Sequence, residues 1–394
     1  MTLRHVCIVT GTRADWGLLT PLARSLRDSG RVRLSIVATN MHLVERCGMT
    51  VREIEEAGFA VDERVPMHTD GDDAAARVRA MGECMQGMAD AFGRLRPDCA
   101  IILGDRYEML AVAAAAAMMR IPIAHIAGGT VSEGAIDDAM RHAITKLSSL
   151  HLVETDDARR RVIQMGEHPA TVIATGALGV WNIMHQKLMS RSQLEATLDG
   201  FRLDPASTLL VTYHPATLDD ADPVERFDQL LAALDRFPDS NVLITLPNND
   251  AGGDAIAARV AAYAAASPAR VKAVASLGMV RYLSALRCVA AIVGNSSSGI
   301  VEVPSMHIPT VDVGMRQHGR PCSHSVIHCG DTADLIEEAI RLALSPAGRS
   351  RAMTAVNPYG RPDTVRLMTD AVIDFVNRAP APKTFYNIPF DLPN

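Results

Sequence analysis

A carboxylate and a guanidinium stand side by side directly after the apolar run at residues 99–103. Gly104 ends the run, and Asp105 and Arg106 follow it. A guanidinium binds phosphate oxygens through charge-assisted hydrogen bonds, and a neighbouring carboxylate can give or take a proton. The pattern therefore indicates a site in which Arg106 meets a phosphate while Asp105 acts as an acid or a base. An ion pair with a purely structural role would give the same pattern.

A second polar segment follows the apolar run 123–126. Its candidate catalytic residues are His125, Glu133, Asp137 and Arg141, and two consecutive glycines, Gly128 and Gly129, lie among them. Consecutive glycines let a ligand approach the backbone closely, and residues 137 and 141 share one face of a helix. So dense a polar group after an apolar run predicts a site. Asp137 is equally well placed to cap a helix N-terminus, so a structural role stays open.

The first apolar run, residues 5–10, leads into a turn that contains Gly11, Arg13, Asp15 and Gly17. A helix is predicted after this turn, and the N–H groups at a helix N-terminus attract anions. We expect Arg13 to meet such an anion, with Asp15 beside it in the ligand site. An ion pair between these two side chains is the structural alternative. The turn lacks the G-x-G-x-x-G pattern that would indicate a dinucleotide.

The second half of the chain carries a complementary set of polar residues, placed at or just after predicted strands. These are His214, Asn248, Ser296, Ser297, Glu302, Arg316 and Arg320. The turn at 294–299 reads Gly-Asn-Ser-Ser-Ser-Gly and precedes a predicted helix, so its N–H groups and hydroxyls can surround an anion. The carboxylate of Glu302 could meet two ribose hydroxyls. With Arg13 and Arg106, this set suits a diphosphate, and no motif typical of a metal site is present.

Short β-branched runs alternate with longer helical patterns through the whole chain, which is typical of parallel sheets. The predicted strands are residues 5–10, 34–38, 99–103, 123–126, 150–153 and 171–173, then 208–212, 242–245, 271–274, 290–293 and 310–313. The fold class is therefore α/β, with two Rossmann-like domains. We place the first domain at residues 1–178, the second at 179–375 and a tail at 376–394. Because open sheets bind ligands at the carboxyl ends of their strands, the site is expected in a central cleft between two such edges.

Composition excludes several classes of partner. The chain has 394 residues and a net charge of −6, which argues against nucleic acid as the main partner. The longest apolar run, residues 109–119, is too short to span a membrane. We therefore expect a cytoplasmic protein with no membrane partner. The seven cysteines show no C-x-x-C spacing and are predicted to be reduced core thiols. The tail rich in proline and aromatics is expected to be either frayed or laid on a surface.

With these residues in hand, the chain resembles the hydrolysing UDP-N-acetylglucosamine 2-epimerase family, including its sialic and legionaminic acid biosynthesis branch. The resemblance covers residues 4–375 and rests on Thr-Arg-Ala-Asp at 12–15, Gly-Asp-Arg at 104–106, Arg-His-Ala-Ile-Thr-Lys at 141–146, His-Pro at 214–215 and the serine-rich turn at 294–299. It implies a fold like that of type B glycosyltransferases, with the nucleotide mainly on the second domain. The UDP-binding residues it implies are Arg13, Arg106, His214, Asn248, Met279, Ser296, Ser297, Glu302 and Arg316, with Met279 facing the uracil.

The resemblance also implies the chemistry, which needs no cofactor. UDP is eliminated across C1–C2 of the sugar to give a glycal, and water then adds to release the free 2-epimeric manno sugar. Asp105 and Asp137 match catalytic carboxylates of the family. Relatives commonly carry a glutamate at positions flanking the Gly-Gly pair, where this chain has Ala127 and Thr130. Glu133 is the nearest acid in the sequence, and it is expected to take part in proton transfer instead.

Two candidate substrates follow from the resemblance, UDP-N,N'-diacetylbacillosamine and UDP-N-acetylglucosamine. The segments 9–19 and 277–286 look closest to the legionaminic branch, which favours the first. We expect the UDP-sugar to be the small-molecule partner and the protein to form a homo-oligomer, either a dimer or a tetramer. The alternatives are a UDP-sugar-dependent glycosyltransferase, a non-hydrolysing epimerase and a catalytically inactive UDP-sugar binding protein.

Overall fold

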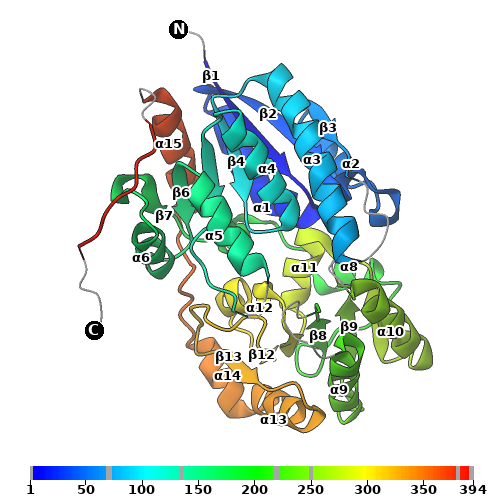
Figure 1. The fold of residues 1–394 in the computed structure, drawn as a ribbon. Coiled ribbons are helices and arrows are strands. Elements are labelled where there is room, and N and C mark those ends of the chain that lie inside the picture. Colours follow the sequence, from blue (N-terminus) through cyan, green and yellow to red (C-terminus); the bar gives the residue numbers. More distant parts are fainter. Residues whose placement is uncertain are drawn as a thin grey trace.

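Two α/β domains make up the protein, whose computed structural model is shown in Figure 1. The structure describes residues 3–67, 73–133, 136–215, 222–247, 252–378 and 382–389. Over these residues, the first domain holds a seven-stranded sheet and the second a six-stranded sheet. The strands pair in parallel in both sheets. The predicted class of two Rossmann-like α/β domains is confirmed.

The first sheet has the strand order β3-β2-β1-β4-β5-β6-β7. Its strands are β1 (Arg4–Thr10), β2 (Val32–Thr39), β3 (Glu63–Val65), β4 (Cys99–Leu103), β5 (Ile123–Ile126), β6 (Leu150–Val153) and β7 (Val172–Ala174). Its helices are α1 (Arg13–Asp28), α2 (Val51–Glu56), α3 (Ala74–Leu95), α4 (Tyr107–Met118), α5 (Asp137–Leu147) and α6 (Asp156–Gln164), with short 3-10 turns η1 (Asn40–Leu43), η2 (Glu45–Cys47) and η3 (Pro169–Thr171). Helices α3 and α4 pack on one face of the sheet and α1 on the other. Helix α7 (Leu178–His185) leads out of this domain.

The second sheet has the strand order β10-β9-β8-β11-β12-β13. Its strands are β8 (Leu209–Thr212), β9 (Val242–Thr245), β10 (Val271–Val274), β11 (Ala291–Gly294), β12 (Thr310–Val313) and β13 (Val326–Cys329). Its helices are α8 (Arg191–Ala196), α9 (Pro223–Asp235), α10 (Gly253–Ala266), α11 (Gly278–Leu286), α12 (Ser297–Val301), α13 (Ala333–Leu344) and α14 (Pro346–Met353), with the 3-10 turn η4 (Val303–Met306). Helices α9 and α13 share one core with the inner strands.

All the predicted strands are present, with ends that differ by at most two residues from the prediction. Strands in the middle of a parallel sheet are buried on both faces, so they appear in the sequence as continuous apolar runs. Two of the four edge strands, β3 and β13, are absent from the prediction. Strand β3 has only three residues and begins with Glu63 and Arg64, and β13 contains the half-exposed His328. An edge strand can lack a continuous apolar run, and these two strands lack the run on which the prediction depended.

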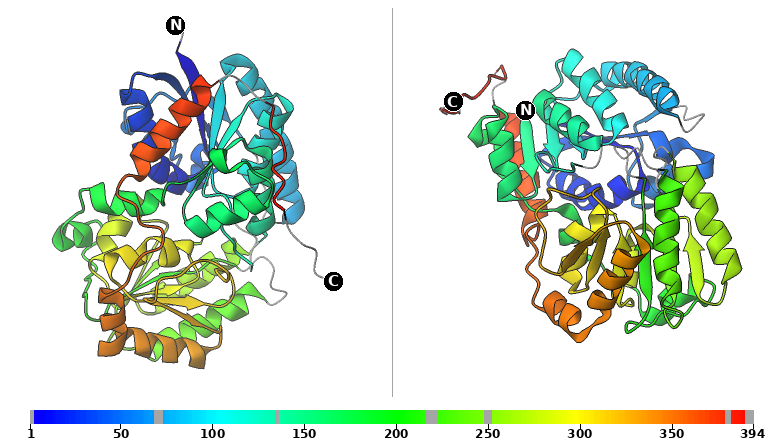
Figure 2. Two further views of the ribbon diagram at one scale, coloured as in Figure 1. Left: turned by 90° about the vertical axis from the view of Figure 1, so that its left-hand side faces the viewer. Right: turned by 60° about the horizontal axis from the view of Figure 1, so that its bottom comes forward.

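Helix α15 (Thr364–Asn377) packs on the first domain although it follows the second in the sequence. Its buried residues Met368, Val372 and Ile373 belong to the core that also contains residues of β1 and α1. Figure 2 (left) shows this helix, in red-orange, beside the blue elements of the first domain. The sequence-based division put residues 364–375 of this helix in the second domain and the last two in the tail, whereas in the structure the helix packs on the first core. An apolar face predicts burial but does not tell which core covers it.

Residues 382–389 of the tail lie along the first domain (Figure 2). Lys383 Nζ lies 2.8 Å from Glu167 Oε2, in a carboxylate that is almost fully buried. The backbone N–H of Tyr386 donates to the Gly166 carbonyl at 2.8 Å. Of the two expectations for the tail, the surface-bound one holds for these residues. The segment is held by a buried ion pair, which a frayed end would lack.

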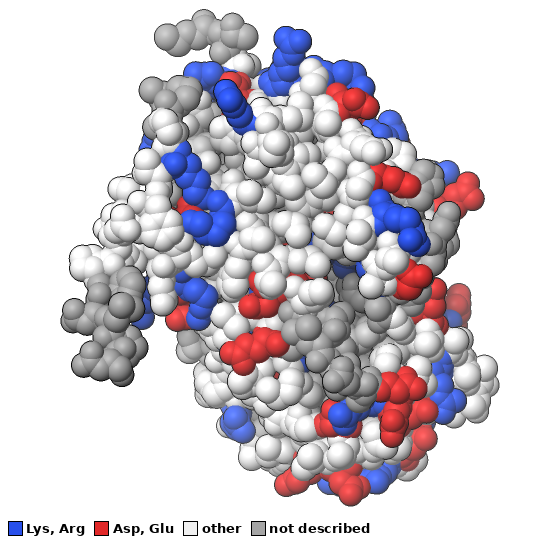
Figure 3. All heavy atoms as spheres, in the orientation of Figure 1, with Lys and Arg blue, Asp and Glu red and all other residues white. Residues whose placement is uncertain are grey.

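Cys7, Cys84, Cys99, Cys288, Cys322 and Cys329 are free thiols. Cys7, Cys84, Cys99 and Cys288 are buried, as the sequence predicted, while Cys322 is exposed and departs from that prediction. In the described part of the chain, no helix is long and apolar enough to cross a membrane. On the face shown in Figure 3, basic and acidic side chains are intermingled. That face offers no continuous basic surface for a nucleic-acid backbone.

The packing of α15 can be tested by shortening one side chain. We expect Met368→Ala to lower the free energy of unfolding by about 2–5 kcal/mol, because it leaves a cavity in the first core. Urea unfolding followed by circular dichroism measures the change. Met118→Ala, at an 82% exposed methionine of the same domain, is the matched control and should change stability little. Equal effects of the two substitutions would show that α15 does not stabilise this core.

Candidate functional site

Three positions of the first domain that could face a ligand lie at the carboxyl ends of three neighbouring strands. Strands β4, β5 and β6 are adjacent in the sheet, and Asp105, Ala127 and Glu154 come within two residues of their ends. Parallel strands bring their carboxyl ends to the same edge of a sheet. The three positions are therefore neighbours along that edge.

The second domain presents the same kind of edge. Strands β8, β11 and β12 are adjacent, and they are followed by His214, Asn295 and the loop 314–320. Side-chain contacts between described residues join the domains here. Arg320 Nη2 donates to Ser132 Oγ at 3.1 Å, and His318 Nδ1 lies 2.6 Å from a carboxylate oxygen of Glu133. The two strand edges therefore face each other, as the sequence predicted.

Arg141 is the centre of the first-domain side. Its side chain is only 2% exposed, and it donates to the carboxylates of Asp105 and Asp138, to Ser132 Oγ at 2.7 Å and to the Thr130 carbonyl at 2.7 Å. A buried guanidinium needs such partners, because an unpaired charge in the interior is very costly. Arg141 therefore fixes the α5 N-terminus, the loop before it and the β4 end to one another.

Asp105 is an ionised carboxylate in this arrangement. Burial opposes its ionisation, but the positive charges of Arg141, Arg320 and Arg316 outweigh that effect and hold the pKa of Asp105 below its ordinary value. A carboxylate that stays charged near neutral pH can act as a base. The structural alternative of a pair between Asp105 and Arg106 is not what the structure shows, because Arg106 Nε donates to Glu108 Oε1 at 2.8 Å.

The turn after β1 has a different internal pairing from the one expected. Thr12 is the N-cap of α1, and Asp15 closes a capping box with it, since the two residues exchange hydrogen bonds of 3.0 and 3.2 Å. Arg13 lies 3.5 Å from Glu53 rather than pairing with Asp15. Burial and the neighbouring Glu108 raise the pKa of Asp15 to about 6. The structure thus gives Asp15 a helix-capping position, and its ligand role stays a prediction.

His125 lies beneath the site and has no exposed surface. Its Nε2 is 2.7 Å from the Gly104 carbonyl, and its Nδ1 is 3.2 Å from Thr145 Oγ1. Burial lowers the pKa of His125 to about 4, so the ring is neutral near pH 7 and its Nε2–H donates to that carbonyl. A neutral, fully buried ring supports the backbone before Asp105. This placement gives His125 a positioning role.

Glu133 and Asp137 lie on either side of two residues that fall outside the described part of the chain. The Glu133 carboxylate is 58% exposed and pairs with His318 of the second domain. Glu133 thus lies on the outer surface where the domains touch, away from the buried charges. Asp137 is the first residue of α5, and its negative charge acts on Arg141. The catalytic roles predicted for both residues remain predictions.

Asn295 organises the second-domain side. Its amide oxygen accepts the backbone N–H of His214 at 2.7 Å, and its amide N–H donates to the His214 carbonyl at 2.8 Å. Its own carbonyl accepts from Arg316 Nη1 at 3.3 Å and from Gln317 Nε2 at 2.8 Å. Asn295 therefore holds the loops after β8 and β12 together. The predicted residues His214 and Arg316 are brought to one place.

The serine-rich turn opens the short helix α12. Ser296 is the N-cap and accepts from the Ser298 N–H at 3.4 Å, and Ser297 is the first helical residue. Glu302 follows at the other end, and burial raises its pKa. Gly179 of α7 must be a glycine for this packing, because a Cβ there would lie 2.2 Å from Glu302 Oε1. Glu302 therefore packs closely against α7.

Two further predicted residues have different outcomes. Met279 in α11 contacts α1, since a Cβ on Gly17 would lie 3.3 Å from the Met279 Cβ, and the Asn182 amide lies 3.0 Å from its sulfur. Met279 thus lies in the contact between the domains, and its role toward uracil stays a prediction. Asn248 lies outside the described residues.

The sequence analysis missed Glu154, which lies among the charges of the site. Burial raises the pKa of Glu154 to about 7, and Arg320, Glu302, Arg141 and Asp105 all act on its charge. Its position as the first residue after a predicted strand was the available signal. Asn295 was within the predicted turn but not singled out. Its role depends on a contact between residues 81 apart in the sequence, which no local pattern reveals.

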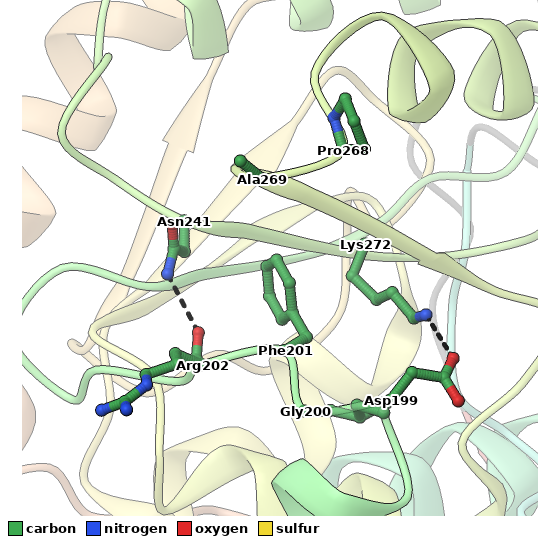
Figure 4. A pocket seen from close by; sticks show the side chains of 9 residues that line it. Asp199, Gly200, Phe201, Arg202, Asn241, Pro268, Ala269 and Lys272 are labelled. Carbon is green, nitrogen blue, oxygen red and sulfur yellow. Dashed lines mark hydrogen bonds and ion pairs between the residues drawn. The ribbon is translucent and has the colours of Figure 1, made fainter.

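A pocket in the second domain lies elsewhere. It has a volume of about 310 Å³, and its lining residues are Leu198, Asp199, Gly200, Phe201, Arg202, Asn241, Pro268, Ala269 and Lys272 (Figure 4). Asn241 directly precedes β9, and Pro268 and Ala269 precede β10. The pocket is thus at the amino ends of the strands, at the edge opposite the clustered charges. Among the described residues, no group of three His, Cys, Asp or Glu side chains could hold a metal ion.

Comparison with known proteins agrees with this arrangement. Residues 24–373 match the family described as UDP-N-acetylglucosamine 2-epimerase. The chain belongs to the UDP-N-acetylglucosamine 2-epimerase family. It is 36% identical over 327 residues to the GDP/UDP-N,N'-diacetylbacillosamine 2-epimerase (hydrolyzing) of Campylobacter jejuni, which covers 83% of this chain and 84% of the relative. It is 35% identical to the UDP-N,N'-diacetylbacillosamine 2-epimerase (hydrolyzing) of Legionella pneumophila, over 87% of this chain and 89% of the relative.

The fold of the family is also that of solved structures. The UDP-GlcNAc 2-epimerase from Neisseria meningitidis, in a crystal structure bound to UDP-GlcNAc, has a TM-score of 0.77 to this chain at 16% identity. The alignment covers 94% of this chain and 100% of that one. This likeness shows the shared fold, while the family match and the two relatives confirm the family expected from the sequence motifs.

The central position of Arg141 predicts a large effect on stability. We expect Arg141→Ala to lower the free energy of unfolding of this epimerase-family protein by about 3–5 kcal/mol, because Asp105 and Asp138 lose the buried guanidinium that they share. Chemical unfolding at neutral pH measures the loss. The exposed Arg366→Ala, whose ion pairs lie on the surface of α15, should cost about 1 kcal/mol or less. A loss at Arg141 no larger than that at Arg366 would contradict the central role.

Proposed function

We propose that this family member is a hydrolysing UDP-sugar 2-epimerase with UDP-N,N'-diacetylbacillosamine as its substrate. The observation that carries the proposal is the likeness to two relatives named for that hydrolysing activity, at 35–36% identity over more than four-fifths of the chain. The products would be UDP and the free 2-epimeric manno sugar. A cytoplasmic location and a homo-oligomeric state remain predictions beside this one.

The second-domain edge is suited to hold the diphosphate. Arg316 lies on the Asn295 carbonyl, and its Nε is buried without a hydrogen-bond partner among the described residues. Arg320 likewise has a buried Nε without a partner there. Buried donors of this kind are costly unless a ligand or water satisfies them. Phosphate oxygens would accept hydrogen bonds from both Nε–H groups, and the hydroxyls of Ser296 and Ser297 would offer further hydrogen bonds to the diphosphate.

The first-domain edge is suited to act on the sugar. The hydrogen on C2 is a weak acid, so cleavage of the C1–O bond must lead, helped by charges that stabilise the departing diphosphate. The ionised Asp105 can accept the C2 proton, because Arg141 and Arg320 keep it charged. The pair of C2–H electrons then forms the C1=C2 bond of a glycal as UDP leaves. Water adds to this glycal to give the free sugar.

A glycosyltransferase and an inactive binding protein are the two alternatives from another class. Both differ from the epimerase in one measurable respect. The epimerase releases UDP from the UDP-sugar alone, a glycosyltransferase needs an acceptor, and an inactive protein binds UDP without turnover. Incubation of the purified protein with UDP-N,N'-diacetylbacillosamine and no acceptor therefore separates the epimerase from both alternatives.

The elimination route predicts an isotope label. Turnover in deuterated water should place deuterium at C2 of the released sugar, because the proton removed from C2 exchanges with solvent before a new one is added. Nuclear magnetic resonance of the product measures the label and the manno configuration. UDP-N-acetylglucosamine in a parallel reaction tests the substrate, and it should turn over more slowly. A product that keeps its C2 proton would point to simple hydrolysis instead.

The nucleotide grip predicts an affinity change. Arg316→Ala should weaken UDP binding by about 1.5–3 kcal/mol, the usual contribution of a hydrogen bond to a charged group. Isothermal titration calorimetry measures the affinity. Arg341→Ala is the matched control in the same domain, since that side chain is 61% exposed and pairs with Glu337 on α13. Wild-type affinity in the Arg316 variant would remove this residue from the UDP site.

A further inference from the structure

Glu154 occupies a distinctive place at the sheet edge. It is the first residue after β6, which pairs with β5 in a register that sets Ile126 beside Leu152. Strand β5 in turn sets Ile126 beside Leu103 of β4. Glu154 and Asp105 therefore follow two strands that flank the same central strand. Ala127, which follows that central strand, contributes only a methyl group between them.

The surroundings of Glu154 are charged groups from both domains. Those that act on it are Arg320 of the loop after β12, Glu302 at the end of α12, Arg141 of α5 and Asp105 after β4, and Glu154 in turn acts on the buried Tyr359. Arg320 and Arg141 both donate to Ser132 Oγ, at 3.1 and 2.7 Å. Within the described part of the chain, the Glu154 carboxyl group makes no hydrogen bond. It therefore lies inside the charged cluster without being tied to one partner.

The surroundings of the two carboxyl groups of this edge shift their pKa values in opposite directions. Asp105 contacts Arg141 directly, and its pKa lies below the ordinary value. Glu154 has no such partner, and burial raises its pKa to about 7. A pair of carboxyl groups whose environments separate their pKa values in this way is suited to supply one base and one acid. Near neutral pH this edge thus offers one ionised carboxyl group and a second one that can carry a proton.

The proposed reaction needs two such groups. Inversion at C2 requires that a proton leaves one face of the carbon and that another arrives at the opposite face. A carboxylate pinned on one side, as Asp105 is by Arg141, cannot reach both faces of a sugar held in one orientation. A second proton carrier is therefore required, and it must be protonated when the glycal forms.

We propose that Glu154 is the acid that protonates C2 of the glycal, an inference that rests on the proposed epimerase function. In the first half-reaction Asp105 takes the C2 proton, the C1–O bond breaks and UDP leaves with the bonding pair. In the second, the Glu154 O–H proton goes to C2, the C1=C2 pair forms the new C2–H bond, and water adds to C1. The proton lost by that water restores Glu154, and Asp105 releases its proton to solvent.

The test separates the two half-reactions. Glu154→Gln keeps the size of the side chain but removes the acid, so elimination should continue while hydration fails. We expect UDP to be released in excess of the free sugar, with the glycal making up the difference. Free-sugar formation should fall by about 10²-fold or more, the usual loss when general acid catalysis is removed. Chromatography for UDP and nuclear magnetic resonance for the sugar and the glycal give both amounts in one reaction.

Two comparisons make the result decisive. Glu154→Asp keeps a carboxyl group and should yield more free sugar per UDP than Glu154→Gln, while the exposed Glu338→Gln on α13 should stay at the wild-type ratio of one to one. Calorimetry with UDP verifies that each variant is folded, and Glu154→Ala replaces Glu154→Gln if the latter is not. A one-to-one ratio in the folded Gln or Ala variant, at any rate of turnover, overturns the assignment. Absence of UDP release from the wild-type protein would instead overturn the proposed function.

Discussion

The buried guanidinium of Arg141 is the interaction on which the site depends. A charge that is 2% exposed must be surrounded by acceptors, and here these come from the β4 end, the loop after β5 and α5 itself. Satisfying one buried cation thus brings together segments that are up to 36 residues apart. The same contacts keep Asp105 ionised. Packing and chemistry are therefore set by a single electrostatic requirement.

The way the domains meet extends this requirement across the molecule. Ser132 accepts hydrogen bonds from Arg141 of its own domain and from Arg320 of the other. Both arginines carry a positive charge, so they repel each other and need anions between them. Asp105 supplies part of that charge in this structure, and a diphosphate would supply more. The interface between the domains is thus electrostatically complementary to the ligand proposed for it.

Sequence alone predicted much of this arrangement, for a physical reason. Central strands such as β4 are continuous apolar runs, and a parallel sheet forces the residues after them to a common edge, so Asp105, His214 and Arg316 could be located. The partners of these residues could not. Local sequence patterns do not reveal long-range contacts. They therefore do not tell whether Arg106 pairs with Asp105 or Glu108, or on which core α15 packs. Glu154 was overlooked because a single acid after a strand is a weak signal until its neighbours are known.

Helix α15 has a consequence for how the chain is made. The N-terminal part of a chain leaves the ribosome first. The core that α15 completes contains residues of β1 and α1 as well as of α15 itself. Its sheet can form early, but the apolar surface that Val372 and Ile373 cover stays open until α15 has been translated. The second domain, whose elements end with α14 at Met353, is finished sooner. Domains usually fold in the order of synthesis. Here the domain that begins first is completed last, so its apolar surface stays uncovered longer than that of the second domain.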